Sequence, residues 1–379
     1  MKENGREHFA SRLGFILVSA GCAVGLGNVW KFPYICGNNG GAIFIIIYLI
    51  CLAALGFPIL VCEFTIGRGS KASIGRAFSI LSPKVKRWSR FRYFGFAGNY
   101  LLMAFYSMVA GWMIYYLVRM LSGSMSDMAP EAVAGEFENL LASPGILILF
   151  TMIVVVACIG VCALGLQKGV EKVSKIMMIA LIVLMVIMAI RSVTLHGSGE
   201  GLKFYLMPDL DRAMERGFGN IIFDAMTHAF FTLSVGIGSM EILGSFMTDD
   251  RTMTGESTIV ICLDTLIALM AGVIIIPACF SYGISPDAGP SLIFITLPNV
   301  FNNMAGGRIF GTLFFIFMSF AALSTVIAVY QNIISISEDL FGISKKKSLI
   351  INMFGIAAAS IPAILGFNLL SNVNLLGEG

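Results

Sequence analysis

Ser19-Ala-Gly-Cys-Ala-Val-Gly-Leu-Gly-Asn28 interrupts an apolar run that extends from residue 13 to residue 37. A second apolar run, 218–246, is interrupted in the same way by Phe231-Thr-Leu-Ser-Val-Gly-Ile-Gly-Ser239. Aligned on their glycines, Ala23-Val-Gly-Leu-Gly27 matches Ser234-Val-Gly-Ile-Gly238. Because glycine in a helix interior costs about 1 kcal/mol relative to alanine, the sequence predicts two helices that unwind at matching positions.

The two interrupted runs belong to a larger set of apolar segments. The residues are 57% hydrophobic and only 12% charged, whereas soluble chains usually carry about 25% charge. Each run approaches the roughly 20 residues that a helix needs to cross a bilayer, and lipid offers no partners to an open strand. We therefore expect an all-α integral membrane protein with nine transmembrane helices, in the runs 13–37, 41–66, 92–121, 144–165, 168–192, 218–246, 256–284, 308–340 and 347–366.

The charges between these runs predict the orientation. Between the second and third runs there are basic residues and no acids, namely Arg68, Lys71, Arg76, Lys84, Lys86, Arg87, Arg90 and Arg92. The loop after the third run carries acids and no base, namely Asp127, Glu131, Glu136 and Glu138. Basic loops stay on the cytoplasmic side. We expect a multi-pass protein of the cell membrane with a cytoplasmic N-terminus.

The two breaks predict an internal repeat and a binding site. They lie five spans apart, so the segments that carry them run in opposite directions, as in the inverted repeats of transporters. We expect a first repeat over 1–192 and a second, incomplete one over 193–379. Unwound backbone persists in a bilayer only where it lines an enclosed cavity. Gly21-x-x-x-Gly25 alone is also typical of a helix-packing face, but the matching break in the sixth run disfavours that alternative.

The chemistry around the breaks suits a zwitterion and a cation. Broken helices expose N–H groups at one end, which attract anions, and carbonyls at the other, which attract cations. A carboxylate in the apolar stretch around Asp264 is expensive unless it meets a cation; the alternative is a protonated, hydrogen-bonded aspartate without a ligand. Hydroxyls such as those of Ser324 and Thr325 often bond back to their own helix. The polar residues beside the breaks are Asn28, Thr232, Ser234, Asp264, Ser324 and Thr325.

Several motifs carry a family resemblance. Arg6-Glu-His-Phe-Ala-Ser-Arg-Leu-Gly14, Gly25-Leu-Gly-Asn-Val-Trp-Lys-Phe-Pro33, Asn39-Gly-Gly41, Glu63 with Gly67-Arg68, and Phe230-Phe-Thr-Leu-Ser234 resemble the neurotransmitter:sodium symporter family. The resemblance runs from the N-terminus to about residue 366. It implies a LeuT-like inverted-repeat fold, with helices one and six unwound at the midplane, and sodium-driven symport by alternating access.

The resemblance also implies two sodium ions and no organic cofactor. The ligands of the first ion would be Asn28, Thr232, Asp264, the carbonyl of Ala23 and the substrate carboxylate. Those of the second would be the carbonyls of Gly21, Val24 and Ala321 and the hydroxyls of Ser324 and Thr325.

The same comparison implies a small-molecule amino acid as substrate, bound beside Ala23 and Gly25. Its carboxylate would meet the amides near Leu26 and Gly27 and the hydroxyl of Tyr106. Its amine would find acceptors at Phe231, Thr232 and Ser234, and its side chain would contact Leu102, Ile237, Thr325 and Val329. Monoamine carriers of this family have an aspartate at the position of Gly25, so an amino acid is expected, and the apolar pocket favours a neutral, hydrophobic one. For Tyr106 and Phe231, plain helix packing is the alternative.

Chloride and gating follow from the same resemblance. Asp264 stands where many members have asparagine, and Ala268 stands where chloride-dependent members have serine, so we expect chloride independence. Arg6 and Asp339 resemble a cytoplasmic latch, with Ser245 or Phe246 near it, and Lys31 resembles an outer gate. Gly169 is followed at the usual ten-residue spacing by Ile179 rather than proline, so the sequence does not predict the family's cytoplasmic release route for the second sodium.

The chain ends at Gly379, after the ninth run. A tenth helix would complete the second repeat and supply an acidic partner for Lys31. The alternative function is therefore a truncated, non-transporting membrane protein that retains ligand binding or acts as a scaffold. The three histidines are scattered without a nucleophile beside them, so we expect no enzyme. The expected partners are the amino acid and the lipid bilayer, with no nucleic acid; the sequence predicts no oligomeric state.

Overall fold

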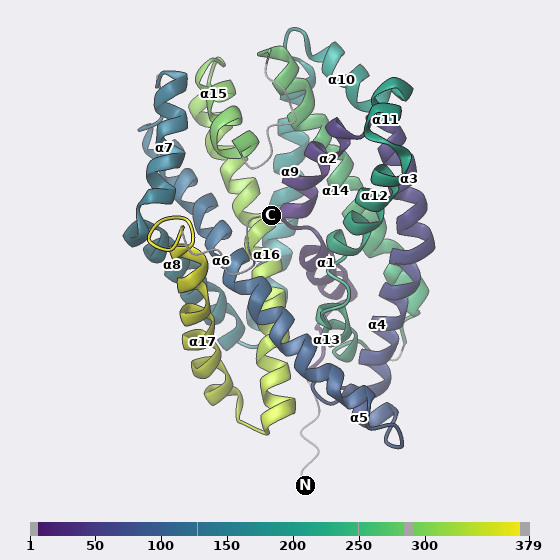
Figure 1. Ribbon diagram of the computed structural model, residues 1–379. Coiled ribbons are helices and arrows are strands. Elements are labelled where there is room, and N and C mark those ends of the chain that lie inside the picture. Colours follow the sequence, from purple (N-terminus) through teal and green to yellow (C-terminus); the bar gives the residue numbers. More distant parts are fainter. Residues whose placement is uncertain (1–6, 127, 249, 284–290, 372–379) are drawn as a thin grey trace.

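The structure, a computed structural model, describes residues 7–126, 128–248, 250–283 and 291–371. Within these ranges all its regular elements are helices, and one isolated bridge joins Gly41 and Pro208. Seven helical segments of the described residues are long and apolar enough to cross a membrane, and a bent pair brings the number to eight. Figure 1 shows these helices running side by side in one bundle.

The spans occupy the predicted runs. In chain order they are α1 (Arg12–Ala23) with η1 (Gly27–Lys31) and α2 (Phe32–Asn38); α3 (Ala42–Cys51), η2 (Leu52–Gly56) and α4 (Phe57–Ser70); η3 (Trp88–Arg90) and α6 (Phe91–Ser122); α8 (Pro144–Ala163); η4 (Leu166–Glu171) and α9 (Lys172–Val193); α14 (Met253–Ser281); α16 (Gly307–Phe341); and α17 (Lys345–Leu365).

Both predicted breaks are present. The first separates α1 from η1 at Val24 and Gly25, and the axes on its two sides are bent by 54°. The second separates α12 (Phe218–Thr232) from α13 (Ser239–Ser245). There the backbone enters the left-handed region at Ser234 (φ 51°), Gly236 (φ 92°) and Gly238 (φ 77°), which ends a right-handed helix.

The second break explains why the sixth predicted run is absent from the uninterrupted spans. The run 218–246 is helical at both ends, but α12 and α13 are each too short to cross a bilayer and the gap between them is long, so they do not count as a span. The sixth predicted span is therefore two half-helices, as its glycines predicted.

The loops contain short helices that hydropathy did not predict, because each is too short or too polar to stand out as an apolar run. They are α5 (Ala77–Leu81), α7 (Pro130–Ala142), α10 (Ser198–Leu206), α11 (Leu210–Arg216) and α15 (Leu297–Asn302), the last preceded by η5 (Leu292–Thr296). Figure 1 shows α10, α11 and α15 toward one end of the bundle and α5 at the other.

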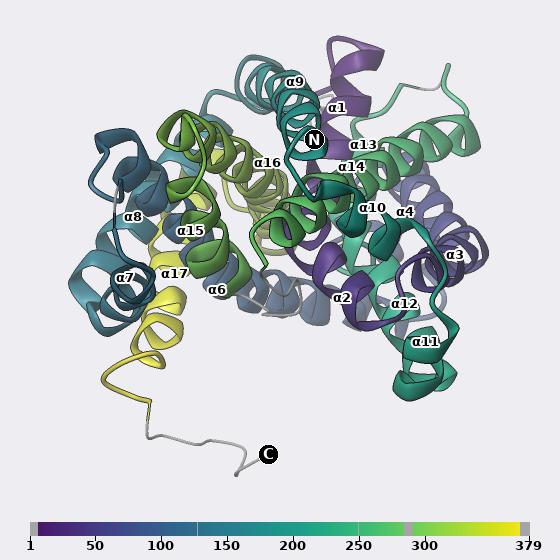
Figure 2. The same cartoon turned by 90° about the horizontal axis from the view of Figure 1, so that it is seen from above.

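The centre of the bundle is built on α16. Of the seven long spans it has the largest buried share, 72% of its most apolar window, and it contacts α1, α6 and α9. Figure 2, which looks down the bundle, shows α16 surrounded by other helices. Because most of α16 is buried, this helix can carry polar groups toward an enclosed site. Ser324 and Thr325 are two such groups on α16.

The start of α1 is tied to the start of the fifth span. The carboxylate of Glu171 accepts hydrogen bonds from the amide of Ala10 (2.7 Å) and the hydroxyl of Ser11 (2.8 Å). Glu7 accepts from the amide of Leu166 (2.6 Å) and pairs with Lys345 (3.0 Å). Burial raises the pKa of Glu7, but these contacts outweigh it, so the pKa lies below its usual value. The segment η4, which contains Gly169 and no proline, is π-helical.

Candidate functional site

A cavity of about 180 Å³ lies between the two breaks. Its wall combines backbone of α1 and the second break with side chains of α6 and α16, so four spans far apart in the sequence meet there. The lining residues are Ala23, Gly25, Gly27, Leu102, Tyr106, Phe230, Phe231, Thr232, Ser234, Val235, Ile237 and Thr325. Most of these side chains are apolar, and the polar groups come from a few positions.

Asp264 is fully buried on α14 (0% exposed) and joins the two broken helices. Its Oδ1 accepts a hydrogen bond from the Asn28 side chain (2.8 Å), and its Oδ2 accepts one from the Thr232 hydroxyl (2.9 Å). Among the described residues it forms no ion pair. A buried carboxylate held only by neutral donors remains costly. The arrangement therefore suits a small cation, since all three side chains offer hard oxygen atoms.

A second group of oxygen atoms lies between α1 and α16. The hydroxyl of Thr325 is 3.2 Å from the carbonyl of Gly21, 3.3 Å from that of Val24 and 3.4 Å from that of Ala321. The hydroxyl of Ser324 donates to the carbonyl of Ala321 (3.0 Å). The structure brings together all five residues expected for a second ion, and both hydroxyls also bond to their own helix, as the alternative interpretation expected.

The hydroxyl of Tyr106 lies at the break of the first helix. It accepts a hydrogen bond from the amide of Leu26 (2.8 Å) and is 5% exposed. Gly25 leaves room for it, because a Cβ at this position would overlap the Tyr106 hydroxyl and lie 2.8 Å from Thr325 Oγ1. A donor amide and a phenol that converge beside a cavity can hold a carboxylate.

Phe231 and Lys31 lie together on one side of the cavity. The Phe231 ring, which lines the cavity, is 43% exposed, and the Lys31 ammonium is 4.8 Å from its centroid. This is a cation–π contact that the sequence did not predict for either residue. The Ser234 hydroxyl donates a hydrogen bond to the carbonyl of Cys22 (2.9 Å).

Some expected residues lie elsewhere. Val329 is fully buried and is not among the residues that line the cavity. Arg6 lies outside the described residues. Asp339 accepts hydrogen bonds from the amide (2.8 Å) and hydroxyl (2.6 Å) of Ser73. The carbonyl of Phe246 accepts from the amide of Phe9 (3.4 Å), and Ser245 bonds within its own helix.

Three polar residues that sequence analysis missed as site residues hold the second break. Glu63 of α4 accepts a hydrogen bond from the amide of Gly236. Asn99 of α6 and Asn332 of α16 both donate to the carbonyl of Ile237, at 2.7 and 3.2 Å. All three lie within apolar runs and are buried, so a search for polar residues in those runs would have found them.

The amino-acid sequence matches a known protein family over most of its length. A model described as the sodium:neurotransmitter symporter family matches residues 6–130 and 136–369. The chain belongs to this family. Its members are sodium-dependent transporters rather than enzymes, sodium is their coupling ion, and they are multi-pass membrane proteins.

Relatives in this family come from bacteria and animals. The chain is 33% identical to an uncharacterized sodium-dependent transporter of Bacillus subtilis (strain 168), and the match covers 100% of this chain and 83% of the relative. It is 34% identical to one of Haemophilus influenzae, over 98% of this chain and 83% of the relative. It is 26% identical to the human sodium- and chloride-dependent taurine transporter, over 97% of this chain and 66% of that protein.

A solved structure shares the fold. The crystal structure of MhsT in complex with L-phenylalanine superposes with a TM-score of 0.89 at 38% sequence identity, and the match covers 98% of this chain and 83% of that one. The LeuT-like fold expected from the sequence is thereby confirmed.

Proposed function

We propose that this chain couples sodium to the symport of a neutral, hydrophobic amino acid by alternating access, without a requirement for chloride. The observation that carries the proposal is the carboxylate of Asp264, which joins the two broken helices beside a mostly apolar cavity. A cation at this carboxylate and a zwitterion in the cavity would each favour the other. Their mutual attraction would couple the two binding events.

In this proposal two sodium ions are cargo. The first would be held by Asp264, Asn28, Thr232 and the carbonyl of Ala23, and the second by the oxygen atoms around Thr325. The substrate carboxylate would displace the hydrogen bond between Tyr106 and Leu26 and complete the first site. Residues 1–192 and 193–379 would then act as the two repeats that rearrange around these ligands, with the N-terminus in the cytoplasm of a cell membrane.

The substrate class follows from the cavity wall. Gly25 offers no carboxylate to an amine that lacks its own, and Leu102, Ile237 and Phe231 favour an apolar side chain. MhsT, which is 38% identical, has been crystallised with L-phenylalanine, whereas the taurine transporter is more distant. We therefore propose large neutral amino acids rather than taurine or creatine.

Chloride independence rests on charge. Asp264 supplies a fixed negative charge beside the proposed first sodium, and the neighbouring Ala268 on α14 is buried and has no hydroxyl for an anion. A second anion so close to a buried carboxylate would be repelled.

Proteoliposomes that contain the purified full chain test the proposal. Radiolabelled phenylalanine, leucine and alanine are offered under an inward sodium gradient, with potassium as the control cation and gluconate replacing chloride. We expect sodium-dependent accumulation of the large apolar substrates that persists in gluconate. Uptake that is equal in potassium would refute sodium coupling, and loss of uptake in gluconate would refute chloride independence. Sodium-dependent binding without accumulation would favour the non-transporting alternative.

A further inference from the structure

Residues 84–91, the basic aromatic segment, connect α5 to α6. The segment reads Lys-Val-Lys-Arg-Trp-Ser-Arg-Phe and ends at Phe91, the first residue of α6. Figure 1 places α5 at the lower end of the bundle, beside the start of α6. The segment therefore lies at the level where a membrane-spanning helix begins, on the side that the charge distribution predicts to be cytoplasmic.

Four cations of this segment have no partner in the described part of the protein. Lys84, Lys86, Arg87 and Arg90 are exposed, and their side chains form no ion pair or hydrogen bond with described residues. Other basic residues are neutralised internally, as Arg12 is by Glu256 (2.9 Å). The basic aromatic segment thus presents four positive charges outward with no acid between them.

Large apolar side chains are interleaved with these cations. Val85, Trp88 and Phe91 are 45%, 52% and 46% exposed, and Phe94, one turn into α6, is 74% exposed. The rings form a continuous row through Phe78, whose centroid is 6.2 Å from that of Trp88 and 6.1 Å from that of Phe91. Phe91 and Phe94 continue the row at 6.2 Å along the spanning helix.

This combination identifies the partner. Aromatic rings prefer the interface between headgroups and hydrocarbon, and Lys and Arg extend past such rings toward headgroups. Each base close to an anionic leaflet raises binding roughly fivefold. A soluble acidic partner would satisfy the cations but not the ring row, which continues onto the lipid-facing side of α6. The geometry therefore favours a ligand that offers an anion and hydrocarbon together.

We propose that the basic aromatic segment is a binding site for the headgroups of anionic phospholipids. The cations contact the phosphate and any second anionic group, and Trp88 and Phe91 lie among the upper acyl carbons. The site anchors the connection between the second and third spans to the bilayer. This inference does not depend on which substrate the protein carries.

Native mass spectrometry of the full chain in neutral detergent tests the site. The protein is titrated with palmitoyl-oleoyl phosphatidylglycerol or with the matching phosphatidylcholine, and the ratio of bound lipids is measured. We expect the wild type to retain at least about tenfold more phosphatidylglycerol than phosphatidylcholine. We expect K84Q/K86Q/R87Q/R90Q to lower that ratio at least about fivefold. Thermal unfolding with each lipid is followed in parallel, where phosphatidylglycerol raises the Tm of the wild type only.

A charge-matched control separates this site from general basicity. K168Q/K172Q/K346Q/K347Q removes four exposed lysines on the same predicted side and is expected to retain the wild-type ratio. W88A/F91A keeps every charge, and we expect it to lower the ratio of bound phosphatidylglycerol to phosphatidylcholine at least about threefold. If the quadruple variant K84Q/K86Q/R87Q/R90Q does not fold, the double variants K84Q/K86Q and R87Q/R90Q replace it. Each is expected to lower the lipid ratio by about half as much, on a logarithmic scale, as the quadruple variant.

Three results would overturn the proposal. The first is a wild type that does not prefer phosphatidylglycerol. The second is an equal loss in the control variant, which would mean diffuse attraction. The third is a W88A/F91A variant that binds like the wild type, which would remove the rings from the site.

Discussion

The buried carboxylate of Asp264 restricts what can bind between the two broken helices. In lipid a carboxylate is stable only when protonated or paired with a cation, and its two hydrogen bonds, to Asn28 and Thr232, come from neutral side chains on the two broken helices. Any ion bound there therefore holds both breaks at once. The side chain links a local charge to the positions of two separate spans.

Asp264→Asn removes that charge while keeping the shape. Because hydrogen bonds and contacts to a charged group contribute about 1.5–3 kcal/mol, we expect the sodium concentration for half-maximal amino-acid binding to rise roughly 10- to 100-fold. Sodium titration of radioligand binding measures the change. Asp224→Asn, the same chemical change in an ion pair with Arg216 (3.2 Å), is the control, and an equal effect in both variants would contradict the prediction.

Tyr106→Phe tests the proposed contact with the substrate carboxylate. The variant loses the hydroxyl that accepts from the Leu26 amide, so we expect the Kd of the amino acid to rise roughly 3- to 10-fold, and stability to fall by about 1–3 kcal/mol because the buried amide loses its acceptor. Equilibrium binding at saturating sodium measures it. Tyr116→Phe is a matched control in the same helix, because the Tyr116 hydroxyl is buried and finds no hydrogen-bond partner among the residues that the structure describes. An unchanged Kd in Tyr106→Phe would remove this residue from the site.

At the scale of elements, the second break is held open by its neighbours. Left-handed backbone at Ser234, Gly236 and Gly238 exposes amides and carbonyls that lipid cannot satisfy. Glu63 binds an amide of this segment, and Asn99 and Asn332 bind the carbonyl of Ile237. Since the Ile237 side chain lines the cavity, these amides also position its wall.

Asn332→Leu tests this control of the cavity. The substitution keeps the branched shape of the side chain but removes a donor to Ile237 and to Asn99. We expect the ratio of phenylalanine to alanine affinity to change at least about threefold, with a loss of about 1–2 kcal/mol in stability. Competition binding measures the ratio. Asn352→Leu, which breaks contacts with Ser337 and Ser348 instead, should destabilise the protein without changing selectivity; a parallel shift in both variants would mean general loosening.

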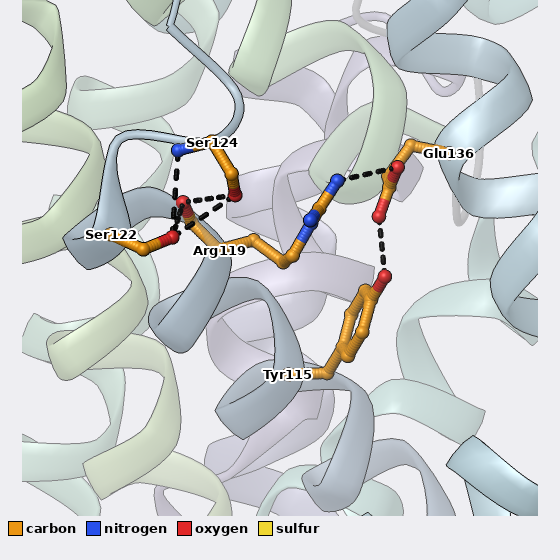
Figure 3. A network of polar contacts seen from close by, with 5 residues as sticks. All are labelled: Tyr115, Arg119, Ser122, Ser124 and Glu136. Atoms are coloured by element: carbon orange, nitrogen blue, oxygen red, sulfur yellow. Dashed lines mark hydrogen bonds and ion pairs between the residues drawn. The ribbon is translucent and has the colours of Figure 1, made fainter.

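For the molecule as a whole, α7 shows how a peripheral helix is attached to the bundle. Glu136 of α7 accepts from Arg119 (2.8 Å) and from the Tyr115 hydroxyl, both on α6. Figure 3 shows the two α6 side chains converging on this carboxylate, with Ser122 and Ser124 at the Arg119 carbonyl. Phe137 stacks on Phe294 of η5 (centroids 5.0 Å apart). The helix α7 thus connects the third span to the segment before α15.

Glu136→Gln is expected to loosen α7 selectively. A partly buried ion pair of this kind contributes about 1 kcal/mol, so amide hydrogen exchange over 130–142 should speed roughly fivefold while α6 and α16 stay unchanged. A double-mutant cycle with Arg119→Gln should give a coupling energy of similar size. Faster exchange throughout the bundle, or no change in α7, would contradict this role.

The positions of the spans and breaks followed from the sequence alone, because in lipid every backbone polar group must be satisfied within the chain. Long apolar runs therefore become helices, and paired glycines within them become breaks. Asn28, Thr232 and Asp264 were recognisable because polar residues in such runs are costly. The short helices α7, α10, α11 and α15 were not, since at the membrane surface water competes for their hydrogen bonds and hydropathy carries no periodic signal.

Only the tertiary structure decided how the other polar groups pair. The family resemblance already implied that Asn28, Thr232 and Asp264 lie together, but not that Asn99 and Asn332 bind the same carbonyl although 233 residues separate them, or that Val329 packs in the core. Such contacts depend on the rotation and tilt of each helix. The rotation and tilt of a helix are set by side-chain packing between spans that are distant in the chain. No local sequence pattern encodes this packing. The sequence by itself determined a bundle with two matched breaks and a buried charge; folding determined the cavity between them.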